Sequence, residues 1–254
     1  MIGGPLGGRG MLGAVLAAAG ARRTYAGKVL SYSPLAYWKL DELSGSAAAD
    51  SSGNGYNAAY GGVTLNGATG PDGKAAPSFD GTNDFINLYS AGYSAAFPWV
   101  RGTVMFWFKA ASAGVWTDST LRYLGLYRLN GSSNQIAIYK LTTANTIRTI
   151  YEATGSGTKF RDVGVSSTGW VHYAFTWDAD TDAGVPYFNG VAAAPLLTPL
   201  SPLTGTGGMN SNLNLLGASS VSSPANGWSG AMAHAAVFST ALSAAAVADL
   251  AVAA

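Results

Sequence analysis

Apolar and polar residues alternate along short segments of the chain, and clusters of turn-forming residues separate these segments. The clearest alternation is in GWVHYAFTWD, residues 169–178, where every second residue from Val171 to Trp177 is large and apolar. A period of two is typical of a strand that buries one face. In GTVMFWFKA, residues 102–110, both faces are largely apolar, which predicts a central strand. The pattern therefore predicts a protein built mainly from β-strands.

Turn chemistry punctuates the chain from residue 34 to its end. Asn189-Gly190 is the strongest short signal for a hairpin. Helix is expected only after Ser243, whose side chain can cap it by accepting a hydrogen bond from an early backbone N–H. No segment repeats with a period of about 20 to 50 residues, which disfavours propellers and solenoids. We therefore expect an all-β sandwich or barrel that ends in a short helix.

The first 33 residues differ from the rest. An uncharged run of Ala, Leu and Gly extends from Met11 to Ala21, too short to span a bilayer, which needs about 20 apolar residues. One interpretation is a secretory signal, with Arg9 before the run and a small-residue cleavage site at its end. We favour an extended arm that packs on a neighbouring subunit, because chain termini are ordered only when something holds them. The expected arm is residues 1–33, its contact residues are Met11, Leu12, Val15 and Leu16, and the body is residues 34–254.

Composition narrows the class of protein. The 254 residues carry 14 Lys and Arg against 13 Asp and Glu, so charged residues make up 11% of the chain, against about 25% in an ordinary domain. Disorder is excluded because the chain is 48% hydrophobic, and a basic nucleic-acid surface is disfavoured because the cations are few and scattered. The absence of Cys excludes thiolate metal sites and cysteine nucleophiles.

Four blocks of sequence resemble a known family. In chain order they are AYWKLDELSGSAAADSSGNGYNA (36–58), SFDGTNDFINL (78–88), GWVHYAFTWDADTDAGVPYFNGV (169–191) and GWSGAMAHAAVFSTALSAAAVADL (227–250). Together they resemble the laminin-G-like, concanavalin A-like lectin-glucanase jelly rolls. The resemblance implies two curved antiparallel sheets packed face to face, here with an N-terminal extended arm and a short C-terminal helix.

The resemblance also implies a place for calcium, which many relatives hold near the turn that begins at Asp50 and at an Asp shortly after the glycine of the last strand. In this chain Gly230 is followed by Ala, Met, Ala and His, so that carboxylate is absent. Calcium takes six to eight oxygens, and the remaining candidate ligands are Asp50, Asn54 and Asp84. The alternative is that these side chains cap turns. No other cofactor is expected.

Catalytic machinery is not visible in the sequence. The only two glutamates, Glu42 and Glu152, are far apart in the chain, whereas glycoside hydrolysis normally uses a pair of carboxylates. The acidic loop at residues 178–182 has the composition of a hairpin tip. His172 and His234 lie within predicted strands without a supporting motif, and we expect them to be hydrogen-bonded structural imidazoles. The chain is therefore predicted not to be an enzyme.

Aromatic residues are the other candidate site. Most are expected in the core, since large aromatic side chains dominate sandwich interiors. Trp116 in AGVWTDST and Tyr93 in SAGYSAAFPW fit polar loops better than strands. Exposed apolar residues in loops tend to mark contact surfaces. We therefore expect Trp116 and Tyr93 to be exposed and to bind carbohydrate.

Two functions remain open. The first is a non-catalytic structural or adhesion protein of a larger assembly, such as a phage capsid decoration or tail protein on a virion surface, because surface hidden between subunits needs little charge. The alternative is a secreted or cell-surface carbohydrate-binding module, as the resemblance suggests. The expected partners are other subunits, in a homo-oligomer or a hetero-assembly, and surface glycans, with no nucleic acid and no membrane span. The expected location is the virion or, for the alternative, the extracellular space.

Overall fold

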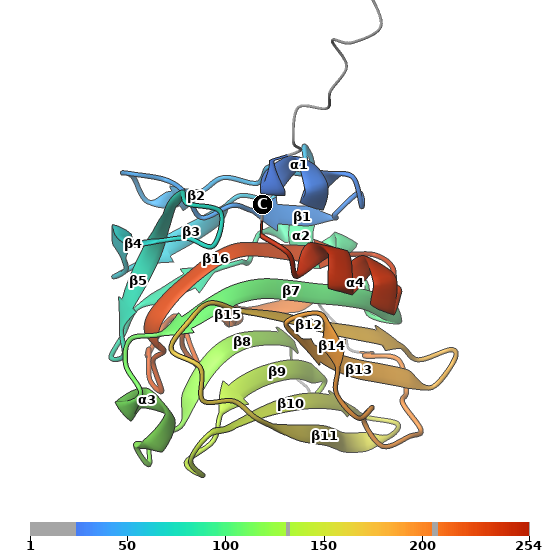
Figure 1. The fold of residues 1–254 in the computed structure, drawn as a ribbon. Coiled ribbons are helices and arrows are strands. Elements are labelled where there is room, and N and C mark those ends of the chain that lie inside the picture. Colours follow the sequence, from blue (N-terminus) through green and yellow to red (C-terminus); the bar gives the residue numbers. More distant parts are fainter. Residues whose placement is uncertain (1–23, 131–132, 205–207, 254) are drawn as a thin grey trace, which may run out of the picture.

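The computed structural model describes residues 24–130, 133–204 and 208–253, and it consists of two antiparallel sheets packed face to face (Figure 1). Sheet A has the order β14 (Val191–Ala192), β13 (Ala183–Phe188), β12 (Val171–Asp178), β7 (Arg101–Ala110), β16 (Ser229–Phe238), β5 (Ala75–Asp80) and β4 (Thr64–Thr69), and β1 (Ala36–Trp38) also pairs with β16. Sheet B has the order β11 (Gly157–Gly164), β10 (Thr146–Ala153), β9 (Gln135–Lys140), β8 (Arg122–Leu129), β15 (Met209–Leu216), β6 (Phe85–Asn87), β3 (Ala58–Gly61) and β2 (Ala47–Ala48). The helices are α1 (Tyr25–Leu30), α2 (Ala91–Ala96), α3 (Gly114–Thr117) and α4 (Ala244–Leu250). The predicted all-β sandwich is confirmed, but the expectation of helix only after Ser243 is wrong, because three short helices precede α4 in the described residues.

The main core lies between the two sheets. β7 and β12 are neighbours in sheet A, and the residues from Gly102 to Phe108 are all buried, which confirms the predicted central strand. On the inner face Phe106 stacks on Tyr173, with ring centroids 5.1 Å apart. The Tyr173 hydroxyl is 2.8 Å from Thr149 Oγ1 in sheet B, which ties the two sheets together through the core. The inward-facing aromatic residues thus set both the spacing and the alignment of the sheets.

A second apolar layer covers the outer face of sheet A, where α1 and α4 lie against the strands (Figure 1). Tyr25 and Val29 of α1 are buried, and Tyr25 Oη donates to Leu250 O at the end of α4 while accepting from Trp107 Nε1 of β7. Residues 24–33 therefore belong to the packed body, and the expected arm of residues 1–33 is wrong for this part of the chain.

The expected contact residues of the arm lie outside the described residues. They are Met11, Leu12, Val15 and Leu16. No helix in the described part of the chain is long and apolar enough to cross a membrane.

The hairpin and the helix cap predicted from the sequence are both present in the structure. Asn189 and Gly190 have φ values of 49° and 78°, so both occupy the left-handed region that the tight hairpin between β13 and β14 requires. Ser243 accepts a hydrogen bond from Ala246 N at the start of α4. The capped helix is thereby fixed next to this hairpin, because Gly190 lies against Ala248.

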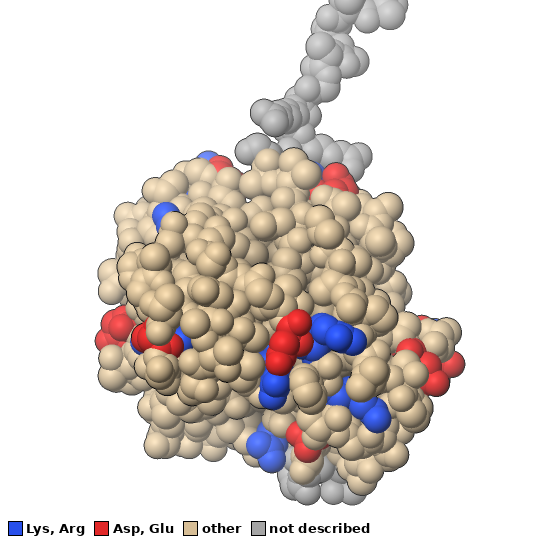
Figure 2. Space-filling view, turned by 60° about the horizontal axis from the view of Figure 1, so that its bottom comes forward, with Lys and Arg blue, Asp and Glu red and all other residues tan. Residues whose placement is uncertain are grey.

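A buried ion pair holds one end of the sandwich together. Lys140 of β9 has no exposed side-chain surface, and its ammonium donates to Asp118 Oδ1 and to the carbonyl oxygens of Asp118 and Thr120. Arg122 of β8 donates to the other oxygen of Asp118 at 2.7 Å and to Gly227 O at 2.8 Å. Charges are sparse elsewhere, and Figure 2 shows a face on which the few cations and anions lie side by side. The contacts of Lys140 and Arg122 with Asp118 and Gly227 join the loop after α3 to β8, β9 and the segment just before β16.

The two histidines differ from each other. His234 meets the expectation of a hydrogen-bonded imidazole, since its Nδ1 is 2.8 Å from Tyr37 Oη and its Nε2 is 3.2 Å from Asp72 Oδ2. His172 does not, because both of its ring nitrogens are buried without a hydrogen-bond partner. It packs edge-on against Trp107, with ring centroids 5.2 Å apart. Burial lowers the pKa of His172 from 6.5 to about 3, so the ring is neutral in the folded protein.

The Asp118→Ala variant is expected to lose about 3–5 kcal/mol of unfolding free energy, because the buried Lys140 ammonium is left without its carboxylate. Asp162→Ala is the matched control, since its partner Arg148 is partly exposed, and it should cost no more than about 1 kcal/mol. Urea denaturation of both variants measures the difference. Equal losses in the two variants would show that burial of the cation does not matter.

The unfolding free energy is expected to fall by up to about 1.4 kcal/mol per pH unit, through His172, as the pH drops below 6.5. The sign follows because the unfolded chain binds a proton there, whereas the folded chain binds none until about pH 3. The window from pH 6.5 to 5 lies above the range of ordinary carboxylates. His172→Leu should remove this slope in urea titrations, and an unchanged slope would refute the assignment.

Candidate functional site

The outer face of sheet B carries a regular grid of side chains on four consecutive strands, β8 to β11. Residues opposite each other in antiparallel strands share a face, and residues two apart on one strand do too. The register therefore places three rows of side chains across the four strands on the side away from sheet A. This surface, termed the meander face, consists of Tyr123, Leu126, Arg128, Gln135, Ala137, Tyr139, Arg148, Ile150, Glu152, Thr158, Phe160 and Asp162.

The first row is aromatic and polar. Tyr123 and Tyr139 are cross-strand neighbours with ring centroids 5.1 Å apart and ring planes tilted by 40°. Arg148 follows on β10 and donates from Nε and Nη2 to the two oxygens of Asp162 on β11, each at 2.7 Å. Burial raises the pKa of both phenols, so the hydroxyls stay protonated at neutral pH. This row thus offers two partly exposed rings and neutral hydroxyl groups.

The second row is an apolar strip. Leu126, Ala137, Ile150 and Phe160 pair in register across the four strands. At the β11 end, Phe160 is 45% exposed and lies under the Arg148 guanidinium, whose carbon is 4.1 Å from the ring centroid. At the other end Leu126 and Ala137 are both buried, in a cluster that includes residues 213, 215, 218 and 221. The strip is therefore open at the edge of the sheet and closed near β15.

The third row is polar. Arg128 faces Gln135 in register, and Gln135 Nε2 donates to Glu152 Oε2 at 2.6 Å. Thr158 lies opposite Glu152 on the edge strand. The apolar strip is thus bordered on both sides by groups that can donate or accept hydrogen bonds. A pyranose ring presents the same combination, an apolar ring face and a rim of hydroxyl groups.

The expected exposure of Trp116 and Tyr93 is wrong. Trp116 is 1% exposed and Tyr93 is fully buried, because the polar segments around them fold into the short helices α3 and α2 and turn both rings into the core. The Trp116 indole N–H donates to Ser167 O at 2.8 Å. Neither ring is available to stack on a sugar. The sequence does carry a signal for the meander face, the alternation from Gln135 to Tyr139. This alternation places Gln135, Ala137 and Tyr139 on one face of the strand.

The calcium candidates act as turn residues in this structure. The Asp50 carboxylate accepts hydrogen bonds from Tyr37 N, Ser52 N, Ser52 Oγ and Tyr56 N, at 2.8 to 3.0 Å. Asn54 Nδ2 donates to Leu35 O. Such contacts are those of side chains that cap turns, which is the alternative to calcium binding.

The third calcium candidate, Asp84, accepts a hydrogen bond from Asp80 N, and burial raises the pKa of its carboxyl group. Among the described residues no group of three or more His, Asp or Glu side chains could hold a metal ion.

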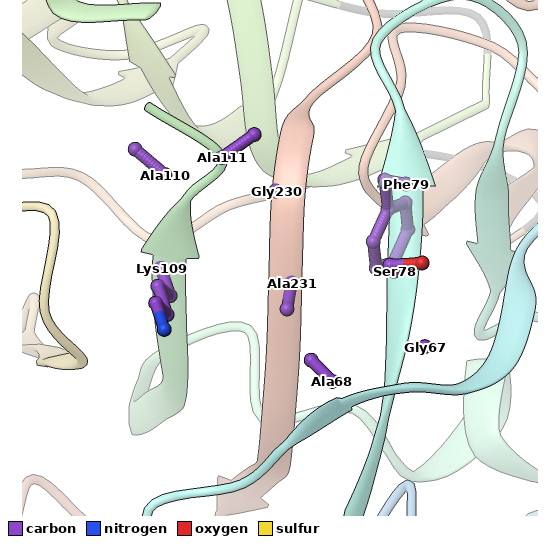
Figure 3. Close-up of a pocket in the computed structure, with 9 residues that line it drawn as sticks. All are labelled: Gly67, Ala68, Ser78, Phe79, Lys109, Ala110, Ala111, Gly230 and Ala231. Atoms are coloured by element: carbon purple, nitrogen blue, oxygen red, sulfur yellow. The ribbon is translucent and has the colours of Figure 1, made fainter. Parts of the chain in front are cut away.

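A pocket lies on sheet A, where β4 folds over β5, β16 and the end of β7 (Figure 3). Its volume is about 250 Å³, and its lining is mostly glycine and alanine. Lys109 and Ser78 supply its only polar side chains. With so few functional groups, this pocket offers less chemistry than the meander face.

Known proteins share this fold at low sequence identity. Domain 4 of AbnA, a GH43 extracellular arabinanase from Geobacillus stearothermophilus in complex with arabinotriose, is 19% identical, with a TM-score of 0.62 over 85% of this chain and 97% of that domain. The botulinum neurotoxin serotype D ligand-binding domain in complex with N-acetylneuraminic acid is 13% identical, with a TM-score of 0.62 over 89% of this chain and 52% of the other. Trypanosoma rangeli sialidase in complex with sialic acid is 13% identical, with a TM-score of 0.61 over 86% of this chain and 32% of the sialidase.

A search of curated proteins gives no match. The family model of the concanavalin A-like lectin/glucanases superfamily, Laminin_G_3, matches residues 80–248, which is more than half of the chain. This stretch holds the strands of the meander face and the centre of sheet A. By this match and by its two antiparallel sheets, the chain belongs to the concanavalin A-like lectin/glucanases superfamily.

Proposed function

We propose that this chain is a non-catalytic carbohydrate-binding protein that binds glycans on the meander face. The observation that carries the proposal is the apolar strip with its two polar borders, because carbohydrate recognition combines stacking on sugar rings with hydrogen bonds to their hydroxyl groups. Tyr123 and Tyr139 supply partly exposed aromatic surface at the border of the strip. The two solved domains described above with arabinotriose and N-acetylneuraminic acid are consistent with such a role for this fold.

The placement of carboxylates supports a binding role rather than hydrolysis. Glu152 and Asp162 are the two carboxylates of the meander face. Asp162 lies opposite Arg148, four residues from Glu152 along β10, which is about 13 Å at about 3.3 Å per residue. Glycoside hydrolysis normally needs two carboxylates within about 9.5 Å. Glu42 accepts hydrogen bonds from Ala49 N and Tyr60 Oη elsewhere on sheet B.

A second candidate function, compatible with the first, is that of a subunit in a larger assembly such as a virion. Its support is the low charge, 11% of residues, which leaves much of the surface in Figure 2 uncharged. Surface that is hidden between subunits does not need charge for solubility. The location that goes with this function is the virion surface, and the location for a free carbohydrate-binding module is the extracellular space.

Tyr139→Thr is expected to weaken glycan binding by about tenfold or more, because the ring supplies aromatic contact area while threonine keeps the strand intact. Val191→Thr is the control, since Val191 is a 71% exposed strand residue of sheet A. A glycan array identifies the ligand, and titration calorimetry measures both variants. Full affinity of Tyr139→Thr together with loss in Val191→Thr would place the site elsewhere.

The full chain is expected to sediment as an oligomer if the N-terminal residues contact other subunits. A double change of Leu12 and Leu16 to Asp should then shift it toward the monomer, because charge is costly in an apolar contact. Sedimentation velocity at several concentrations measures this. A full chain that stays monomeric throughout would contradict the assembly function.

A further inference from the structure

We propose that the meander face selects uncharged glycans over acidic ones. This inference rests on the proposed function and names the class of glycan that the face accepts. Its basis is the balance and the pairing of the charged side chains on the face.

The formal charge of the meander face is zero. It carries two cations, Arg128 and Arg148, and two anions, Glu152 and Asp162. The first row holds Arg148 and Asp162, and the third row holds Arg128 and Glu152, so each of these rows has one cation and one anion. An approaching anion is therefore neither attracted nor concentrated by the face as a whole.

Arg148 is already engaged in a bidentate ion pair. Two of its nitrogens donate to Asp162, and its guanidinium covers the ring of Phe160. A sugar carboxylate that approached these donors would have to displace Asp162 or lie beside it and be repelled. Bidentate pairing is the strongest way for Arg to hold a carboxylate, and here it is used within the protein.

The other cations of these strands are turned away or occupied. Lys159 and Arg161 alternate with Phe160 on β11 and so project to the opposite side of the sheet, where Arg161 donates to Pro195 O. Lys140 and Arg122 hold Asp118. None of the four adds positive charge to the meander face.

Besides the charged side chains named above, Arg128 among them, the groups on the borders of the strip are neutral. Gln135 and Thr158 lie along one border of the strip, and the phenols of Tyr123 and Tyr139 lie along the other. Amide and hydroxyl groups both donate and accept, which suits the hydroxyl groups of neutral sugars. Binding of such a ligand should also depend little on salt, since no net charge is neutralised.

Matched pairs of oligosaccharides test this inference with the full chain. Lactose is compared with sialyllactose, and fully methyl-esterified oligogalacturonate with its free acid, on an array and by calorimetry. The expected result is that the neutral member of a bound pair binds more tightly than the acidic one, and equal affinities would overturn the selectivity. Its affinity should change less than about twofold between about 0.05 and 0.5 M NaCl.

Glu152→Gln sharpens the test, because it gives the meander face one net positive charge. The ratio of acidic to neutral binding should rise about twofold to fivefold. Asp180→Asn is the matched control, since it makes the same change in total charge at an exposed loop of sheet A, and the ratio should stay constant.

The outcomes separate the two proposals. Preferential, salt-sensitive binding of acidic glycans would overturn the selectivity and leave the carbohydrate-binding function standing. Absence of binding to every glycan on the array would overturn the function itself, and the selectivity with it. A ratio that Glu152→Gln does not change would show that the charge balance of the meander face does not set the preference.

Discussion

The burial of one face of β8–β11 against sheet A is the constraint on which the exposed grid depends. Ile136, Ile138, Ile147 and Tyr151 occupy the inner face, so every intervening side chain of β9 and β10 must point outward. A slip of one residue would bring Arg148 and Glu152 into the core, at a cost of several kcal/mol for each charge, which is a large part of the roughly 5–15 kcal/mol that stabilises a domain. The hydrophobic interior thereby fixes the order of polar and apolar rows on the opposite surface.

The two outer faces of the sandwich differ in whether helices cover them. Sheet A is covered by α1 and α4, and the hydroxyl of Tyr25 joins both helices to β7 through Leu250 and Trp107. Sheet B carries no helix over β8–β11 in the described part of the chain, and its outer side chains stay partly exposed except for Leu126 and Ala137. Because one sheet face is closed by the chain itself, the open one is the broad surface left for a ligand.

Local signals were sufficient to predict the strands, the Asn189-Gly190 hairpin and the Ser243 cap, because each depends on neighbours in the sequence. Burial of Trp116 and Tyr93 could not be predicted in this way, since it depends on how short helices in polar segments turn toward the core. The candidate site was missed for a related reason. Its rows exist only through the pairing register of four strands, and no single strand contains one.

The pairing of β11 with β10 leaves the other side of β11 at the rim of sheet B, where its backbone groups could template a further strand. Consider a second copy of β11 that pairs there in the antiparallel direction and keeps both faces of the sheet. If the two Phe160 residues lie opposite each other, Lys159 of each copy lies opposite Arg161 of the other. Centring on Arg161 would place two arginines together. Such like-charge pairs are unfavourable, so the strand that keeps the apolar strip open to solvent also resists fibrillar growth of the sheet.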